Sequence, residues 1–487
     1  MKNNKLTYKK FCSLIEQGYT TIPVFKRILA DTLTPVSAWM KLSIDCKQGF
    51  ILESAEKGLA YSRYSYVGCK PTKTVWSNNH KSIHIFEENC SYDLDIPILE
   101  YVNNSLASYN CSSITNMPDF TGGFIGYLGY ESVSSFEKVR VHSKEVLGEP
   151  GSLFMLFDDL ISFDHLKGEA VVISNVHLER NSDKKRLYND AIDKIDQMGN
   201  QLHTDIEFRT PVIKSRSTTS SNFNKEGFIA AVDKAKNYIE KGDIFQVVIS
   251  QCFQRHTYAD PLNIYRALRN INPSPYLFHI KYNEIDIVGA SPEILVKVED
   301  RNVEVRPIAG TRPRGMNVDE DNKLAEELIN DPKECSEHLM LLDLGRNDVG
   351  RVCDFGSIEI NDKMIIEKYS HVMHIVSNVE GVFNNKYSKF ETMLSGFPAG
   401  TVSGAPKIRA MEIIDELETT KRKVYAGGIG YFSANGEFDT CIALRTAVAK
   451  NKKFYVQSGA GIVADSKPQN EYLETVNKAK ALLKAIE

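Results

Sequence analysis

The segment from Phe397 to Lys478 constrains the fold of this chain more than any other stretch. Four motifs follow one another there with almost no intervening sequence: FPAGTVSGAPKIRAME, YAGGIGYFS, CIALRT and SGAGIVADSKPQNEYLETVNKAKAL. Glycine loses more backbone entropy on folding than any other residue, so this density is costly unless the backbone must approach something closely. The segment therefore predicts β-strands and tight turns that border a binding site.

The last motif predicts a helix that starts at Pro468, because proline suits the first helical turn. An apolar stripe at helical spacing is expected to pack inward; it consists of Tyr472, Val476, Ala479 and Leu483. Glu471, Glu474 and Lys478 share a second face of this helix. Taken alone, they favour an exposed salt-bridge ladder, since Glu474 and Lys478 have the stabilising i, i+4 order.

A second acidic helix is predicted upstream. Asp331 is a good N-cap, Pro332 fits the first helical position, and Glu334 favours the positive end of the helix dipole. Glu334 and Glu337 then lie one turn apart, as Glu471 and Glu474 do on the later helix. If the two helices face each other, these carboxylates predict a Mg²⁺ site completed by water and substrate oxygens.

Composition excludes several classes of protein. The 487 residues are 42% hydrophobic and 25% charged, which is typical of a soluble globular protein. The net charge of -4 and the lack of a basic block argue against nucleic-acid binding by bulk charge. No signal peptide or membrane span is recognisable, so we expect a cytoplasmic location.

The composition also divides the chain. Residues 207–222, EFRTPVIKSRSTTSSN, are polar, rich in Ser and Thr, and predict a linker between an N-terminal domain, 1–206, and a C-terminal domain, 223–487. Strands are predicted at 49–54, 64–67, 170–176 and 244–250, and helices at 179–202 and 228–239. The glycine cluster at 121–129 lacks the pattern of a phosphate loop, so close strand packing explains it better.

Three features are ambiguous when considered without relatives. Gln246 is a polar residue on a strand that is predicted to be buried, where a hydrogen-bonded core amide would explain it equally well. Glu293 follows a strand and a Ser-Pro turn, which suits either a carboxyl of altered acidity in a cleft or surface decoration. His374 is interpreted as a single catalytic or packed histidine.

The motifs together resemble the chorismate-utilising enzymes, and the chain is most similar to component I of anthranilate synthases. The resemblance covers nearly all of 225–487 in the order of that family, and ILESAEKG and RYSYVG at 51–68 resemble its N-terminal part. Further matching motifs are PIAGTRPRG, EHLMLLDLGRNDVGRV, HVMHIVSNVEG and DTCIALRT. The resemblance implies an α+β fold with sandwich-like central β-sheets and surrounding helices.

The resemblance also implies roles for individual residues. It places Mg²⁺ on Glu337 and Glu474, supported by Glu334 and Glu471. It implies catalytic roles for Glu293, the general acid, for His374 near the substrate ring, and for Thr401. The implied chorismate-binding positions are Gly310, Thr311, Tyr425, Arg445, Gly459, Ala460, Gly461 and Lys478. The implied tryptophan-binding positions are Glu53, Ser54, Pro275, Tyr276 and Leu277.

The activity implied is the conversion of chorismate and ammonia to anthranilate and pyruvate, the first step of tryptophan biosynthesis, with feedback inhibition by tryptophan. Because no glutaminase triad is recognisable, a separate glutamine amidotransferase subunit is expected, in a heterotetramer. Isochorismate synthases carry a lysine at the position of Gln246. Aminodeoxychorismate synthases carry a lysine at the position of Ala309. Neither Gln246 nor Ala309 offers an amine. Both enzymes remain alternatives, as does a tryptophan-binding sensor without activity.

Overall fold

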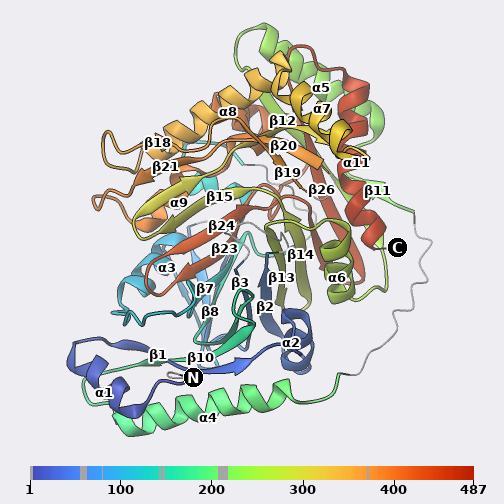
Figure 1. Cartoon of the computed structure of the whole chain (residues 1–487). Helices are drawn as coiled ribbons and strands as arrows, with labels where there is room; N and C mark the ends of the chain where they lie inside the picture. The colour runs from blue at the N-terminus through green and yellow to red at the C-terminus, as the bar shows by residue number, and fades with distance from the viewer. Residues whose placement is uncertain are drawn as a thin grey trace.

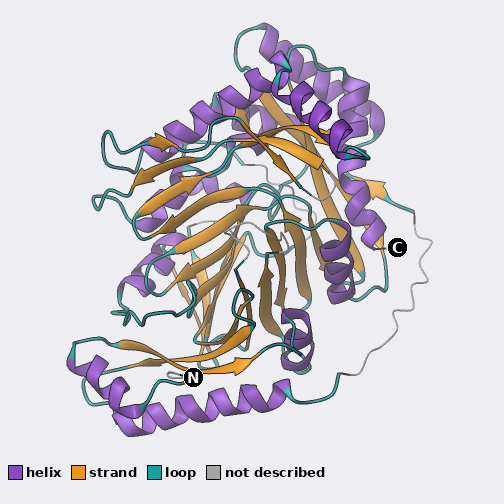
Figure 2. Cartoon of the chain, viewed as in Figure 1, coloured by secondary structure: helices purple, strands orange, loops and turns teal. Residues whose placement is uncertain are grey.

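Two large antiparallel β-sheets occupy the centre of the molecule, and helices surround them (Figures 1 and 2). This computed structural model describes residues 4–54, 63–78, 81–141, 144, 148–206, 218–369 and 372–486. Layers of helix outside central sheets define an α+β protein, as the resemblance implied.

The larger sheet contains twelve described strands. In spatial order they are β1 (Thr21–Leu29), β10 (Glu169–His177), β9 (Asp159–Asp164), β3 (Tyr64–Cys69), β2 (Gln48–Glu53), β13 (Tyr276–Tyr282), β14 (Ile285–Ser291), β25 (Thr446–Lys450), β26 (Lys453–Ile462), β12 (Gln246–His256) and β11 (Ser220–Ser221), with β22 (Gly404–Ala405) also pairing with β12.

The second sheet contains eleven described strands. In order they are β18 (Glu359–Ile360), β21 (Val379–Val382), β16 (Asn302–Val305), β15 (Ile294–Glu299), β24 (Phe438–Ile442), β23 (Gly428–Ser433), β7 (Gly123–Leu128), β8 (Ser152–Phe157), β4 (Lys73–Ser77), β5 (Ile83–Glu87) and β6 (Cys90–Leu94). A small third sheet has the order β17 (Ile308–Pro313), β20 (Val372–Val376) and β19 (Ile365–Lys368).

The helices cover the outside of these sheets. They are α1 (Tyr8–Glu16), α2 (Pro35–Leu42), α3 (Ile98–Ala107), α4 (Lys184–Leu202), α5 (Lys225–Glu240), α6 (Pro261–Ile271), α7 (Val318–Ile329), α8 (Pro332–Gly350), α9 (Lys389–Ser395), α10 (Lys407–Leu417) and α11 (Pro468–Ala485). Helix α4 lies beside β1 and β10, whereas α5, α7, α8 and α11 gather at the opposite end of the molecule (Figure 1).

The hydrophobic core lies on both faces of the second sheet. Along β7, Ile125 and Tyr127 join the cluster shared with the larger sheet, whereas Phe124 and Leu128 join a second cluster beneath helices. This alternation follows from the two-residue period of a strand. A side chain at Gly126 would collide with the Leu153 carbonyl of β8. The glycine cluster around it therefore serves close strand packing, as predicted.

Both large sheets combine strands from the N-terminal and C-terminal segments. Leu277 of β13 pairs with Glu53 of β2, and Gly428 of β23 pairs with Leu128 of β7. Residues 207–217 of the predicted linker lie outside the described residues, and Ser220–Ser221 at its far end pairs with β12. The domain boundaries remain a prediction, but the two segments share their sheets.

Most predicted elements are present, with shifted ends. Helix α8 begins as expected, because Asp331 accepts hydrogen bonds from the N–H groups of Lys333 and Glu334. Helix α4 starts at Lys184, capped by Asp183, rather than at 179. Strand β12 begins at Gln246, later than predicted, and extends to His256. The predicted stripe of α11 packs inward: Ala479 is fully buried, and Tyr472, Val476 and Leu483 are partly buried against the core. The buried face also includes Thr475, Leu482 and Ala485.

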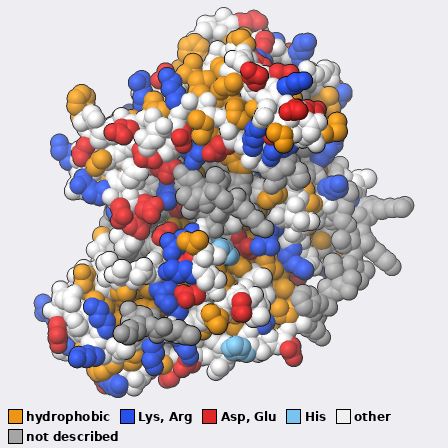
Figure 3. All heavy atoms as spheres, viewed as in Figure 1, with side chains coloured by type: hydrophobic (Ala, Val, Ile, Leu, Met, Phe, Trp, Pro, Cys, Tyr) orange, Lys and Arg blue, Asp and Glu red, His pale blue; other side chains and the backbone are white. Residues whose placement is uncertain are grey.

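None of the described helices combines the length and apolarity needed to cross a bilayer. On the face shown in Figure 3, basic and acidic side chains are interspersed rather than segregated. That mixed pattern agrees with the small net charge of -4.

Candidate functional site

The predicted catalytic and substrate-binding residues converge on one cavity of about 230 Å³. Its walls come from β12 and β26, from β17 and β20 of the small sheet, from α8 and α11, and from the 3₁₀ turn Gly400–Val402. The predicted residues that line it are Glu293, Thr311, Glu337, His374, Thr401, Tyr425, Arg445, Gly459, Gly461 and Lys478. We call it the catalytic cavity.

The remaining predicted residues lie just behind this lining or at its rim. Ala460 is fully buried in the core on the other face of β26, because its neighbours Gly459 and Gly461 face the cavity. Gly310 contributes its carbonyl to His374. Glu474 is on α11 with 46% of its side chain exposed, and it pairs with Lys478 at 2.7 Å.

Glu293 is a buried carboxyl between β14 and β15. Burial raises its pKa to about 8, and the Thr401 hydroxyl beside it only partly opposes the shift. The backbone fixes its position, because the N–H of Ile442 donates to the Glu293 carbonyl at 3.0 Å. A carboxyl with this pKa keeps its proton at neutral pH and can act as a general acid. The alternative of surface decoration is therefore wrong.

His374 is held neutral and oriented. Burial and the charge of Arg445 lower its pKa. Its Nδ1 lies 2.9 Å from the carbonyl of Gly310 and 3.0 Å from Thr311 Oγ1. A carbonyl can only accept, so Nδ1 carries the hydrogen and Nε2 is left with a free lone pair. Gly310 has φ +66 at a bulge of β17, a conformation that favours glycine.

The glycines of β26 make room for polar side chains that enter the cavity. A Cβ on Gly459 would lie 2.8 Å from the Tyr425 hydroxyl, and one on Gly461 would lie 2.8 Å from Gln246 Nε2. Burial raises the pKa of Tyr425 to about 12, so its hydroxyl stays protonated. Gly459 and Gly461 thus reflect close approach to the catalytic cavity, whereas Gly427 and Gly430 allow close contact between strands.

Arg445 is a partly buried arginine that no described carboxylate pairs with. Its Nη1 donates to Asn272 Oδ1 at 2.9 Å, and burial lowers its pKa. Among the described residues, no Asp or Glu forms an ion pair with it. A partly buried positive charge that faces only a neutral amide is prepared for an anionic ligand, because a carboxylate can accept two parallel N–H bonds from arginine.

The predicted acidic helices α8 and α11 both border this cavity, where Glu337 of α8 and Lys478 of α11 line it. Burial and the neighbouring charges of Glu334 and Glu474 raise the pKa of Glu337, which accepts a bond from Gln246 Nε2 at 3.4 Å. The carboxylate of Glu334 forms an ion pair with Arg312 at 3.0 Å. In the described chain, no three His, Cys, Asp or Glu residues converge as a complete metal cage.

The arrangement nevertheless fits Mg²⁺. This ion is typically bound by one or two carboxylates and keeps water or substrate oxygens at its other positions. The charge of Glu474 contributes to the raised pKa of Glu337, and a cation between the two carboxylates would relieve that repulsion. Glu334 and Glu471 lie one turn away on their respective helices.

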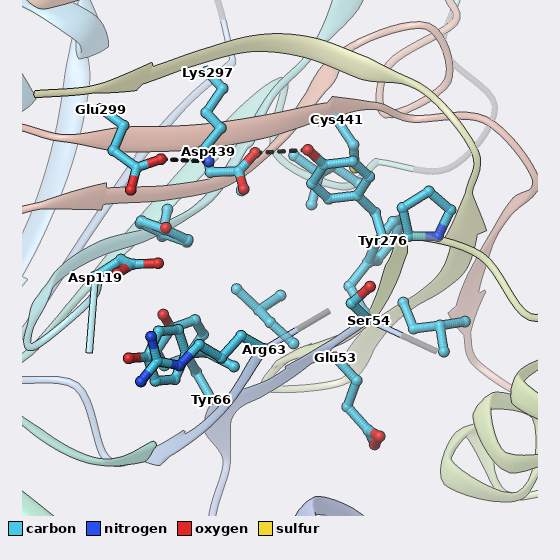
Figure 4. Close-up of a pocket in the computed structure, with 18 of the residues that line it drawn as sticks. Glu53, Ser54, Arg63, Tyr66, Asp119, Tyr276, Lys297, Glu299, Asp439 and Cys441 are labelled. Carbon is cyan, nitrogen blue, oxygen red and sulfur yellow. Dashed lines mark hydrogen bonds and ion pairs between the residues drawn. The ribbon is translucent and has the colours of Figure 1, made fainter. Parts of the chain in front are cut away.

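A second cavity, of about 420 Å³, contains the predicted tryptophan-binding residues (Figure 4). We call it the regulatory cavity. Its walls include the predicted residues Glu53, Ser54, Pro275, Tyr276 and Leu277. Tyr276 donates to Asp439 at 2.8 Å, and Lys297 pairs with Glu299 at 2.6 Å. The buried hydroxyl of Ser54 has no hydrogen-bond partner in the described chain, so it is available to a ligand.

Glu53 borders the regulatory cavity, but its carboxylate points away from it (Figure 4). Tyr265 of α6 donates to one carboxylate oxygen at 3.0 Å, and Arg269 of α6 donates to the other at 3.0 Å. The side chain therefore ties β2 to helix α6 instead of reaching the ligand space.

Sequence reasoning missed one contact that matters, that of Asn272 with Arg445. The two prolines of the block Asn-Pro-Ser-Pro-Tyr at 272–276 predict a rigid turn, but no local pattern pairs residue 272 with residue 445. It also missed Asp119 in the regulatory cavity, whose pKa is raised to about 6 by burial. A lone aspartate after a proline gives no signal of burial.

The fold and the catalytic cavity together define a chorismate-binding enzyme. The family model described as "chorismate binding enzyme" matches residues 47–484, and the chain belongs to this family. It is 45% identical over 483 residues to anthranilate synthase component 1 of Acetivibrio thermocellus, which covers 97% of each chain. It is 44% identical over 475 residues to the component 1 of Cereibacter sphaeroides, covering 95% of this chain and 94% of that protein.

The structural comparisons agree. Anthranilate synthase component I from Streptococcus pneumoniae TIGR4 superimposes with a TM-score of 0.78 at 35% identity, covering 94% of this chain and 99% of that one. The isochorismate synthase MenF of Escherichia coli gives a TM-score of 0.71 at 17% identity over 99% of both chains, a likeness of fold alone.

Proposed function

We propose that this chain is the aminating subunit of an anthranilate synthase. It converts chorismate and ammonia to anthranilate, pyruvate and water. The near full-length similarity to component 1 proteins supports the assignment. The observation that carries it is the catalytic cavity itself, where a protonated Glu293, a neutral His374 and an unpaired Arg445 converge.

Substrate binding follows from the charges of the cavity. Arg445 would donate two parallel hydrogen bonds to one carboxylate of chorismate, and the charge of Lys478 would neutralise the other carboxylate. Lys478 is fixed for this by the Gly459 carbonyl at 3.1 Å and by Glu474. Mg²⁺ held by Glu337 and Glu474 would supply Lewis-acid polarisation and orientation of the ring carboxylate.

The chemical step needs a proton donor and a proton acceptor. Ammonia adds to the ring carbon beside the ring carboxylate, the double bonds shift, and the 4-hydroxyl leaves as water. Glu293 gives the proton to that hydroxyl, because hydroxide is a poor leaving group. His374 Nε2 then takes the proton from the aminated carbon as pyruvate departs and the ring becomes aromatic.

The nucleophile is external ammonia, because the cavity offers no free amine. Gln246 and Ala309 line it where lysines of related enzymes would act, and Lys478 is already engaged by Glu474. Ammonia is mostly protonated at neutral pH, so we propose that a glutamine amidotransferase subunit delivers it, in a cytoplasmic heterotetramer. Tryptophan in the regulatory cavity would provide feedback inhibition.

The direct test is incubation of the purified chain with chorismate, Mg²⁺ and an ammonium salt. We expect fluorescent anthranilate and pyruvate in equal amounts. A 4-amino product would instead indicate an aminodeoxychorismate synthase, and isochorismate formed without ammonia would indicate an isochorismate synthase. Tryptophan binding without any turnover would indicate a sensor.

A further inference from the structure

We propose that Asn272 is the positioning residue for Arg445 and that helix α6 links the regulatory cavity to the catalytic cavity through it. The proposal deepens the regulation of the proposed function and therefore rests on it. It assigns the coupling to a continuous set of contacts between two cavities that share no lining residue.

The first contact fixes the guanidinium. Asn272 Oδ1 accepts from Arg445 Nη1 at 2.9 Å, the one side-chain hydrogen bond of Arg445 within the described residues. The backbone of Arg445 has φ +46, unusual for a residue other than glycine, and its carbonyl accepts from the Ala290 N–H at 3.2 Å. The backbone is therefore held by β14, while the direction of the side chain depends on Asn272.

Asn272 is in turn fixed to the end of α6. Its N–H donates to the Leu268 carbonyl at 2.8 Å and so caps the helix. Its Nδ2 lies 3.3 Å from Ser274 Oγ and 3.5 Å from the Ala290 carbonyl. Pro273 and Pro275 restrict the backbone that follows. A displacement of this turn would therefore be passed to Arg445 rather than absorbed.

The turn after α6 lines the regulatory cavity, and α6 itself is joined to the wall of that cavity through Glu53. Tyr265 and Arg269 hold the Glu53 carboxylate at 3.0 Å each, directly before Ser54 in the cavity wall. Tyr276 and Leu277, at the start of β13, are part of the same wall. A ligand that binds between Ser54 and Tyr276 thus contacts the turn that holds Asn272 directly and reaches α6 through Glu53.

The chemistry of the amide suits this role. Asn272 orients the guanidinium but leaves its full positive charge for the carboxylate of chorismate. An aspartate of the same shape would form an ion pair with Arg445 and compete with the substrate. Substitutions at position 272 therefore separate the orientation of Arg445 from its free charge, because alanine removes the hydrogen bond and aspartate adds a competing negative charge.

The first experiment measures ammonia-dependent kinetics of the full chain. We expect Asn272→Ala to raise KM for chorismate about tenfold, the usual effect of losing one hydrogen bond to a charged group, with kcat within about threefold. Asn272→Asp should raise KM further although it preserves shape. The matched control is Asn270→Ala, an exposed asparagine on the same helix. If Asn272 had only a structural role, both variants would lose kcat and thermal stability, and KM would not rise from the unmodified chain to Asn272→Ala to Asn272→Asp.

The second experiment measures coupling by calorimetry, with tryptophan titrated in the presence and absence of chorismate and without ammonium, so that no turnover occurs. Because coupling between two sites is reciprocal, chorismate should weaken tryptophan binding to the unmodified chain by about tenfold. In Asn272→Ala the tryptophan Kd without chorismate should stay within about twofold, while the effect of chorismate is lost.

The outcomes separate the two claims and the proposed function. Unchanged KM in both Asn272 variants overturns the positioning role. A raised KM with full coupling retained overturns the route through Asn272. If the unmodified chain forms anthranilate but does not bind tryptophan, the regulatory part of the proposed function fails, and the KM series still decides the positioning role.

Discussion

The two cavities differ in how their buried charges are neutralised. In the regulatory cavity, charged and polar groups pair within the protein: Lys297 with Glu299, Tyr276 with Asp439, and Glu53 with Arg269 of α6. In the catalytic cavity, Arg445 faces an amide and Glu293 faces a hydroxyl.

This difference indicates what each cavity can bind. A buried charge without a partner costs stability, which is recovered only when a ligand of opposite charge binds. The catalytic cavity is therefore complementary to a dianion such as chorismate, and its unpaired groups have altered acidity suited to catalysis. Several charged groups of the regulatory cavity are already paired within the protein, which suits a zwitterion that adds no net charge, such as an amino acid.

The largest effect should come from removing the acid of the catalytic cavity. Glu293→Gln preserves shape but cannot give a proton to the leaving hydroxyl, so kcat should fall by roughly 10²–10⁴-fold. The measurement is initial anthranilate fluorescence at saturating chorismate. Glu359→Gln, an exposed glutamate on β18, is the control and should behave as the unmodified chain. Full activity of Glu293→Gln would contradict the contrast between the cavities.

Arg445→Lys tests the unpaired cation itself. A lysine keeps the charge but cannot form the planar double hydrogen bond, so KM for chorismate should rise by about 10–100-fold with little change in kcat. Steady-state kinetics with ammonium as substrate measure this change. Arg186→Lys, on the exposed face of α4, provides the comparison. An unchanged KM would show that the substrate carboxylate binds elsewhere.

The pH dependence tests the acidity of Glu293. Its pKa is raised to about 8, so it loses its proton as pH rises through that value, and the rate at a fixed concentration of free ammonia should then fall about tenfold per pH unit. Because the folded state binds this proton more tightly than the unfolded state, Glu293 makes the protein less stable as pH rises from about 4.5 to about 8. Relative to the unmodified chain, Glu293→Gln should gain stability across that range. Denaturant unfolding at several pH values measures this gain. If the unfolding free energies of the two proteins changed with pH in the same way, the raised pKa of Glu293 would be refuted.

The smallest effect is expected in the regulatory cavity. Tyr276→Phe removes the bond to Asp439 and leaves a buried carboxyl without that partner, so the tryptophan concentration for half inhibition should rise about fivefold. The rate without tryptophan should stay within about twofold, since Tyr276 does not line the catalytic cavity. Inhibition curves with ammonium as substrate give both values. A large loss of uninhibited rate would mean that the cavities are not separate in function.

Sequence patterns succeeded where the physics is local. Asp331, Pro332 and Glu334 predicted the start of α8, and Pro468 predicted that of α11, because capping depends on the first few residues. The start of α4 moved from 179 to Lys184, because Asp183 caps the helix there. The apolar stripe of α11 packs against the core as predicted, although its most buried positions include Thr475 and Leu482 beside the stripe.

Part of the site could also be predicted from sequence. Glycines at 459 and 461 indicated close approach, and the structure places Tyr425 and Gln246 against them. The resemblance identified residues whose side chains gather in one cavity. It gave no means to see that Ala460 faces the core or that the Glu53 carboxylate turns toward α6.

The sequence by itself determined the helix starts, the close approach at the glycines, and the membership of a family whose members act on chorismate. Only the tertiary structure decided the acidity of Glu293 and the isolation of Arg445, because desolvation depends on everything packed around a group. It likewise decided that residue 272 meets residue 445, a contact made by two turns that only the assembled sheet brings together.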